Sequence, residues 1–262
     1  MSGSIPATLF VIFTCPNKFD AIHYYMSAKI RKPTFADRII DFNHHLNFDG
    51  DLPHGIRIMN PYQESETAVQ VSDQFYRKYY NDHGKRHLIL GINPGRFGSG
   101  VTGISFTDPK RLMEYCGIPF KGRLTHEPSS EFIYDMITAY GGPELFYTKF
   151  YISSVCPLGF TITGDSGKEK NYNYYDNKEL LTAAYPFIVK EMEKQIKLGF
   201  ETDIVYCFGQ GKNEQFLRKL NAEKKFFKRI IALPHPRYIM QYKSKMKSTF
   251  VDEYLKAFNE IA

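Results

Sequence analysis

A short apolar run followed by a glycine-rich loop, between His87 and Phe106, restricts the class of fold that this chain can adopt. Leu88-Ile89-Leu90 ends at Gly91, and an apolar run of this length bounded by Gly and Pro is typical of a buried strand. Asn93 follows at the carboxyl end of that strand, and Pro94-Gly95 predict a turn directly after it. Open α/β folds bind ligands at this end of their strands. The loop matches neither the Walker A pattern nor GxGxxG, so it is either a ligand loop of another kind or a turn without chemistry.

Three more apolar runs predict strands, at Phe150–Cys156, Asp203–Gly209 and Arg229–Leu233. Segments in which apolar residues recur at helical spacing separate these runs. Strands that alternate with helices indicate a parallel sheet with helices on both faces. We therefore predict an α/β fold, a three-layer αβα sandwich with a central four-stranded parallel sheet.

Local signals predict where the helices begin and end. Thr34 followed by Asp37 predicts a capping box, and Asp108-Pro109 predicts a second helix start, with Gly117 beyond its end. The remaining helices are expected over residues 63–80, 130–140, 177–198 (broken or kinked at Pro186), 210–220 and 245–261. Residues 159–176 lack periodicity and are rich in Gly, Asn, Tyr and Lys, so we expect a long polar loop there.

Length and charge fit one basic domain. The chain has 262 residues with 43% hydrophobic content, enough for one large α/β domain, which we assign to residues 31–262. Residues 1–30 are expected to be an N-terminal extension, and the apolar run at 7–13 is too short to span a bilayer. No membrane partner is therefore expected. The net charge of +6 suits either a polyanionic partner or a small anionic substrate.

The four cysteines are Cys15, Cys116, Cys156 and Cys207, and no two are close enough for a CxxC metal site. No metal site is therefore predicted. Cys156 and Cys207 lie in apolar runs and are expected to be buried free thiols. Free thiols indicate a reducing compartment, so we expect the protein in the cytoplasm, associated with the nucleoid if it is bacterial.

Three of the four predicted strands end in a polar residue, namely Asn93, Ser154 and His235. The carboxyl ends of parallel strands meet at one edge of a sheet. An amide, a hydroxyl and an imidazole from distant parts of the chain are therefore expected to meet there, as an α/β active site requires.

The strings around these three residues resemble one family. GINPGRFG, followed by TGISF, is similar to motif 1 of the uracil-DNA glycosylase superfamily, and most of all to its single-strand-selective monofunctional (SMUG) type, which has GMNPG, FG and then TGxPF. The spacing from Asn93 to Phe106 matches that motif without a gap. SSVCPL (Ser153–Leu158) and PHPRY (Pro234–Tyr238) follow in the family's order, so the resemblance extends from about residue 35 to the C-terminus.

This resemblance implies a monofunctional DNA glycosylase of base excision repair, which flips uracil out of DNA and hydrolyses its N-glycosidic bond without metal or cofactor. In such an enzyme Asn93 would orient the attacking water. His235 would donate a hydrogen bond to the departing base, a role in which a preorganised donor supplies roughly 3 to 4 kcal/mol. Phe106 would stack on the base, and Gly95 and Phe97 would also line its site. The implied partner is uracil-containing DNA, single- or double-stranded, and we expect a monomer that does not cleave the strand, because no lysine is expected beside the water.

The sequence departs from the SMUG pattern at two places. SMUG enzymes have Asn where this chain has Ser154, and one hydroxyl cannot reproduce the paired donor and acceptor of an amide. We therefore expect a looser pocket that admits xanthine as well as uracil. The family also has HPSPRN where this chain has PHPRY, so the segment that would enter the DNA helix is two residues shorter. The expected wedge and DNA-binding residues are Arg237, Tyr238, Lys243, Lys168 and Lys170.

Two other functions fit the same scaffold. A non-catalytic relative would keep the pocket and bind DNA in a salt-sensitive way without forming abasic sites. A small-molecule hydrolase could use Cys156 as its nucleophile, which would require an exposed thiol of low pKa with a base nearby.

Overall fold

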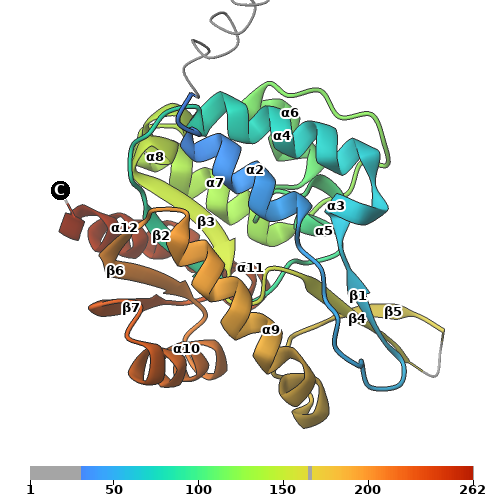
Figure 1. Cartoon of the computed structure of the whole chain (residues 1–262). Helices are drawn as coiled ribbons and strands as arrows, with labels where there is room; N and C mark the ends of the chain where they lie inside the picture. Colours follow the sequence, from blue (N-terminus) through green and yellow to red (C-terminus); the bar gives the residue numbers. More distant parts are fainter. Residues whose placement is uncertain (1–30, 165–166, 262) are drawn as a thin grey trace, which may run out of the picture. The chain divides into compact units, whose positions relative to one another are not determined.

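A computed structural model describes residues 31–164 and 167–261 of the chain. From Pro33 onward the chain forms one compact unit (Figure 1). The N-terminal extension predicted for residues 1–30 lies outside the described residues, and so does Cys15. Within the described part, no helix is both long enough and apolar enough to cross a membrane.

A parallel four-stranded sheet forms the centre of the unit, as the sequence predicts. Its strands are β2 (His87–Gly91), β3 (Phe150–Ser154), β6 (Glu201–Phe208) and β7 (Arg229–Leu233), in the spatial order β3-β2-β6-β7 (Figure 1). Strand β2 lies between β3 and β6, and its three apolar side chains are completely buried. A strand enclosed in this way reads as a continuous apolar run, which is why Leu88-Ile89-Leu90 identifies it.

Helices cover both faces of this sheet. Phe150 of β3 packs on Phe258, with ring centroids 4.7 Å apart, whereas its neighbour Tyr151 packs on Phe35, at 6.0 Å. Successive side chains of a strand point to opposite faces, so Phe258 and Phe35 belong to different helical layers. The predicted three-layer αβα sandwich is confirmed.

The helix starts carry the predicted capping signals. Thr34 accepts a hydrogen bond from the Asp37 backbone and the Asp37 carboxylate accepts one from the Thr34 backbone, which completes the predicted capping box of α2 (Phe35–His44). Asp108 caps α6 (Pro109–Cys116), and Gly117 ends it in the left-handed conformation. The other helices are α3 (Pro61–Glu64), α4 (Glu66–Tyr80), α5 (Ser99–Thr102), α7 (Pro128–Tyr140), α8 (Pro143–Lys149), α9 (Lys178–Lys197), α10 (Lys212–Lys224), α11 (Pro236–Tyr242) and α12 (Lys247–Phe258), with short 3-10 turns at Ser244–Met246 and Asn259–Ile261.

Two predictions about secondary structure are wrong. Residues 159–176 are not a long loop, because they contain β4 (Gly159–Thr163) and β5 (Glu169–Tyr172), which pair with β1 (Ile56–Met59) in an antiparallel sheet of order β1-β4-β5. This sheet extends away from the helices at the lower right of Figure 1. The second is the break at Pro186, because α9 runs through this residue without interruption; the alternative, a kink there, stays a prediction. Pro186 is exposed, so the carbonyl that loses its partner there can face water.

Candidate active site

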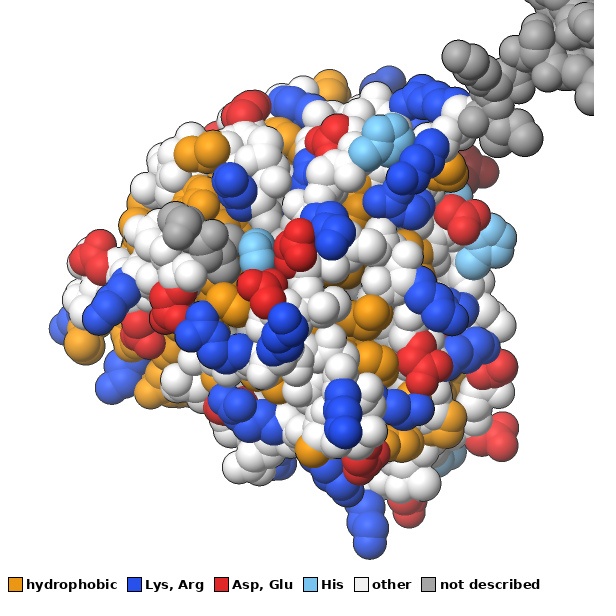
Figure 2. All heavy atoms as spheres, turned by 60° about the vertical axis from the view of Figure 1, so that its left-hand side comes forward, with side chains coloured by type: hydrophobic (Ala, Val, Ile, Leu, Met, Phe, Trp, Pro, Cys, Tyr) orange, Lys and Arg blue, Asp and Glu red, His pale blue; other side chains and the backbone are white. Residues whose placement is uncertain are grey.

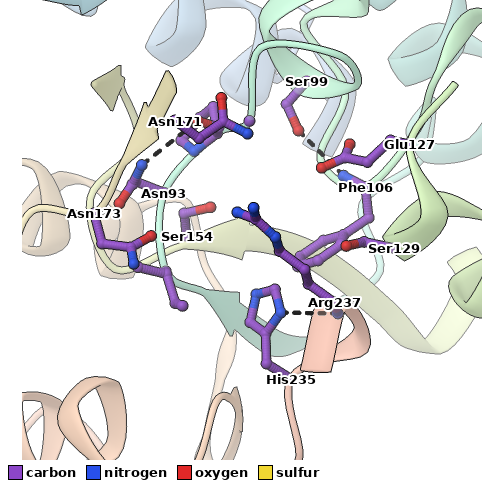
Figure 3. Close-up of a pocket in the computed structure, with 13 residues that line it drawn as sticks. Asn93, Ser99, Phe106, Glu127, Ser129, Ser154, Asn171, Asn173, His235 and Arg237 are labelled. Carbon is purple, nitrogen blue, oxygen red and sulfur yellow. Dashed lines mark hydrogen bonds between the residues drawn. The ribbon is translucent and has the colours of Figure 1, made fainter. Parts of the chain in front are cut away.

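A small cavity of about 90 Å³ lies where β2, β3 and β7 end. Its lining includes the three predicted residues, Asn93, Ser154 and His235, which the structure brings together (Figure 3). The remaining lining residues are Ile92, Pro94, Gly95, Ser99, Phe106, Glu127, Ser129, Asn171, Asn173 and Arg237. We call this cavity the base pocket, after the flipped base that it is predicted to bind.

The Asn93 amide is held in one orientation by backbone groups of the β5 end. Its Nδ2 donates to the Tyr172 carbonyl at 3.1 Å, and its Oδ1 accepts from the Tyr174 N–H at 3.2 Å. A flipped amide would place like groups against each other at both contacts. An amide oxygen accepts two hydrogen bonds, so Oδ1 retains one acceptor site besides the Tyr174 N–H.

A buried amide in α10 supports this arrangement from behind. Asn213 is 1% exposed, and its Nδ2 donates to the Phe208 carbonyl at 3.1 Å. Its Oδ1 accepts from the Tyr174 hydroxyl at 2.9 Å. Asn213 therefore ties the end of β6 to the residue whose N–H orients Asn93.

His235 is the N-cap of α11, and its ring is oriented by that helix. Its Nδ1 accepts a hydrogen bond from the Arg237 backbone N–H at 3.1 Å, so in the neutral ring the proton lies on Nε2. Figure 3 shows Nε2 on the pocket side of the ring. Burial, and to a lesser extent the Arg237 guanidinium, lower the pKa of His235 from 6.5 to about 4. At neutral pH the site therefore presents an uncharged N–H donor.

Gly209 turns the chain directly after β6, beside His235 and Asn213. Its φ is +115°, whereas a Cβ there would make only ordinary contacts, at 3.4 Å from Asn213 and 3.7 Å from the His235 ring. A glycine accommodates this left-handed backbone without strain.

Phe106 forms a wall of the base pocket in a strained conformation. Its φ is +52°, which is uncommon for a residue with a side chain and is typical of functional sites. Its N–H donates to the Ser99 hydroxyl at 3.2 Å (Figure 3). Gly91 makes room for the ring, because a Cβ at that position would come within 2.8 Å of it. The Phe106 ring lies 5.6 Å from the His235 ring, centroid to centroid.

Ser154 ends β3 beside Gly91 and is 5% exposed. Its hydroxyl makes no hydrogen bond to any residue in the described part of the chain. A buried hydroxyl without a protein partner is available to a ligand.

Gly95 lines the base pocket, but Phe97 does not. The Phe97 side chain is 38% exposed and lies under the Arg96 guanidinium, 4.2 Å from the ring centroid. It lines two hollows, of about 540 and 420 Å³, and the larger of them shares residues with the base pocket. Phe97 is therefore not among the residues that line the base pocket, where its contact with the flipped base was predicted.

Four predicted DNA-binding residues lie outside the base pocket, and one lines it. Arg237 reaches into the pocket from α11 (Figure 3). Tyr238 lies in the same helix and is 45% exposed, and Lys243 follows the helix end. Lys168 and Lys170 are exposed on the β4–β5 hairpin, and Lys170 lines the larger hollow with Arg96 and Arg237. The segment predicted to be a wedge loop is therefore mostly helix α11.

Basic side chains line both hollows. Arg96, Lys170 and Arg237 line the larger one, which shares Arg237 with the base pocket. Arg57, Arg96, Lys121 and Arg123 line the smaller one, where Arg57 is paired with Glu64 and Glu169. The face shown in Figure 2, in contrast, carries basic and acidic side chains interspersed. Clustered cations beside a pocket suit a phosphate backbone.

Sequence reasoning missed Glu127, which lines the base pocket from the start of α7. Its Oε2 is buried and has no hydrogen-bond partner in the described part of the chain. Burial, followed by the nearby Asp108 carboxylate, raises the pKa of Glu127 from 4.5 to about 7, although Arg237 opposes the rise. No periodicity marks a lone Glu before a proline, so pattern reasoning had no signal for it.

Asn171 and Asn173 were also missed, because both belong to the stretch interpreted as a loop. Asn171 Oδ1 accepts from the Arg96 N–H at 3.0 Å and so joins the hairpin to the glycine-rich loop. The alternation of Phe160 and Ile162 with Thr161 and Thr163 was the available sign of a strand.

The buried thiols do not suit nucleophilic chemistry. Cys156 is completely buried, and burial raises its pKa to about 12, whereas a nucleophile needs an accessible thiolate. Cys116 and Cys207 are buried as well. In residues 31–164 and 167–261, no group of three or more His, Cys, Asp or Glu side chains could hold a metal ion.

Comparison with known proteins identifies the family of the chain. A family model described as the uracil DNA glycosylase superfamily matches residues 77–259. A solved structure, described as the crystal structure of wild-type SMUG2 from Pedobacter heparinus, superposes with a TM-score of 0.86 and is 60% identical in sequence. That match covers 87% of this chain and 98% of the other. No curated protein matches the chain.

Proposed function

The chain belongs to the uracil DNA glycosylase superfamily and is an N-glycosyl hydrolase of the uracil-DNA glycosylase type, and we propose that it acts by extruding the damaged base into the base pocket. A duplex hides the glycosidic bond, so the nucleotide must leave the stack before the bond is reached. The sugar then approaches an oxocarbenium ion while the base departs as an anion.

The neutral Nε2–H of His235 stabilises the departing base. The donor is fixed by the Arg237 N–H on the other ring nitrogen, and it meets the base oxygen where negative charge develops. A fixed donor needs no reorganisation during the reaction, and such donors contribute roughly 3 to 4 kcal/mol. This orientation of His235 is the observation that carries the proposal.

Asn93 positions the attacking water without acting as a base. An amide does not take up a proton near neutral pH, so Asn93 cannot act as a general base. Its Oδ1 can accept one hydrogen bond from the water and so direct the water oxygen at the sugar. The rate enhancement then comes mainly from stabilising the leaving base. No lysine lines the base pocket among the described residues, which fits hydrolysis without a Schiff base or strand cleavage.

Phe106 stacks on the extruded base, and Ser154 contacts its edge through one hydroxyl. Aromatic stacking contributes roughly 1 to 3 kcal/mol per base and tolerates different bases. One hydroxyl sets a weaker requirement than an amide, so xanthine is a second substrate beside uracil. The cations of the larger hollow hold the DNA backbone, and residues of α11 (Arg237 and Tyr238) fill the space that the base leaves. We further propose that the protein acts as a monomer in the cytoplasm.

The direct test uses an oligonucleotide with one uracil, or one xanthine, treated with the protein and then with alkali. Cleavage at the modified position only after alkali shows an abasic site and an intact strand beforehand. Loss of this product in Asn93→Ala and in His235→Asn, with unchanged binding to DNA, supports the assigned roles. An unchanged rate in His235→Asn would contradict the proposed stabilisation of the base.

A further inference from the structure

We propose that Glu127 contacts the extruded base and helps to select which base is removed. This inference rests on the proposed function, because it concerns the same pocket. Glu127 lines both the base pocket and the larger hollow beside it, so it stands where a base would enter. Figure 3 shows its carboxyl pointing into the pocket.

The Glu127 carboxyl makes no hydrogen bond within the described part of the protein. Glu127 is the N-cap of α7, where an acidic side chain usually accepts hydrogen bonds from the first turn. Here it makes no such bond, and Oε2 is buried without any partner among the described residues. A buried polar atom left unpaired is costly, which points to a partner that arrives with the substrate.

The glycine-rich loop is shaped around this carboxyl. A Cβ at Gly98 would lie 1.7 Å from Oε2, and one at Gly95 would lie 2.8 Å from Oε1. The backbone of Glu127 is also fixed, since its N–H donates to Asp108 Oδ2 at 2.8 Å and Asp108 is completely buried. The side chain is therefore held against Gly95, which itself lines the base pocket.

The protonated carboxyl can hydrogen-bond to the base through Oε1, because only Oε2 is fully buried. Depending on which oxygen holds the proton, Oε1 can donate to a carbonyl of uracil or xanthine or accept from the adjacent N–H. The ionised carboxylate only accepts and would repel the base carbonyl. The raised pKa, about 7, keeps a large fraction protonated near neutral pH. The charged or titratable groups around it are Asp108, Arg237, Arg96, Lys170 and His235.

The experiment measures single-turnover excision of uracil and of xanthine between pH 5.5 and 8.5. Glu127→Ala should slow excision by about tenfold at pH 6, the effect of one buried hydrogen bond. Glu127→Gln keeps a donor and an acceptor, so its rate should stay within about threefold of wild type at pH 6. The wild-type rate should fall as pH rises above about 7, whereas the Glu127→Gln rate should not.

Two variants and one binding measurement separate contact with the base from a structural role. Gly98→Ala must displace the carboxyl and should lose about as much activity as Glu127→Ala. Glu144→Gln, whose side chain is 74% exposed on α8, makes the same charge change away from the pocket and should match wild type. Binding to DNA with an abasic-site analogue should be equal in all variants, because no base is present to contact Glu127.

The proposal is overturned if Glu127→Ala excises both bases at the wild-type rate, or if Glu127→Gln keeps the wild-type pH profile. Parallel loss of excision and abasic-analogue binding would overturn it as well, because it would indicate a structural role. Wild-type protein that removes neither base would instead refute the proposed function, so the two failures are distinguishable.

Discussion

Replacing Glu127 with Gln should stabilise the protein at pH 8 and leave its stability nearly unchanged at pH 4. In the folded protein the pKa of Glu127 is about 7, whereas the ordinary value expected for the unfolded chain is 4.5. Between these values the folded protein holds the proton and the unfolded chain releases it. The free energy of unfolding therefore falls as pH rises through this window, and the whole cost is present above about pH 8.

The size of the effect follows from the same two values. A difference of about 2.5 pKa units, at 1.36 kcal/mol for each, corresponds to about 3 kcal/mol. Glutamine has nearly the same shape and does not ionise, so the variant avoids this cost. A gain of this size is a considerable part of the 5 to 15 kcal/mol that stabilises a typical domain.

Urea unfolding followed by far-ultraviolet circular dichroism measures this difference at pH 4, 6 and 8; the chain has no tryptophan for fluorescence. Taking the variant minus wild type at each pH cancels the titration of every other group. A difference independent of pH would refute the reasoning, and so would a variant less stable than wild type at pH 8. Either result would show that the carboxyl ionises freely in the folded protein.

Four other measurements test the remaining parts of the site. The depressed pKa of His235 should make wild type lose up to about 3 kcal/mol of stability as pH falls from 6.5 to 4, and His235→Asn should lack that loss in acid unfolding experiments. Asn93→Ala should slow single-turnover uracil excision at least about 100-fold while leaving the Kd for abasic-analogue DNA unchanged; a parallel loss of affinity would contradict a role in placing water. Ser154→Asn should raise the ratio of uracil to xanthine excision by about tenfold, and an unchanged ratio would remove Ser154 from substrate selection. Lys170→Ala should lower the slope of log Kd against log salt by about one, as expected for one lost phosphate contact.

The parts of the fold that could be predicted from sequence are those whose signal is local. Strand β2 is buried on both faces, so its apolar run is continuous, and Thr34 and Asp108 mark helix starts by short-range capping. The meeting of Asn93, Ser154 and His235 followed from one rule, that the carboxyl ends of parallel strands share an edge. None of these inferences needed a contact between distant side chains.

The β4–β5 hairpin could not be predicted in this way because its stability comes from a distant partner. Strand β4 pairs with β1, more than 90 residues earlier, with Ile56 opposite Ile162. Strand β5 is polar and carries Glu169 and Lys170, so its sequence has no apolar run that would indicate a strand. The consequence for function is direct, since the backbone at the end of this hairpin orients Asn93.

The position of the Glu127 side chain depends on two glycines elsewhere in the sequence, Gly95 and Gly98, which lie against its carboxyl. Read alone, the glycines at 95 and 98 suggest a loop that cradles an anion with its backbone. In the structure these glycines leave room for the Glu127 carboxyl instead. Whenever this carboxyl ionises, it would repel an anion bound beside it. The uncharged, hydrogen-bonding face of a nucleobase has no such conflict with the protonated acid. The same glycines therefore argue for a base, rather than a phosphate, as the group that the loop accommodates.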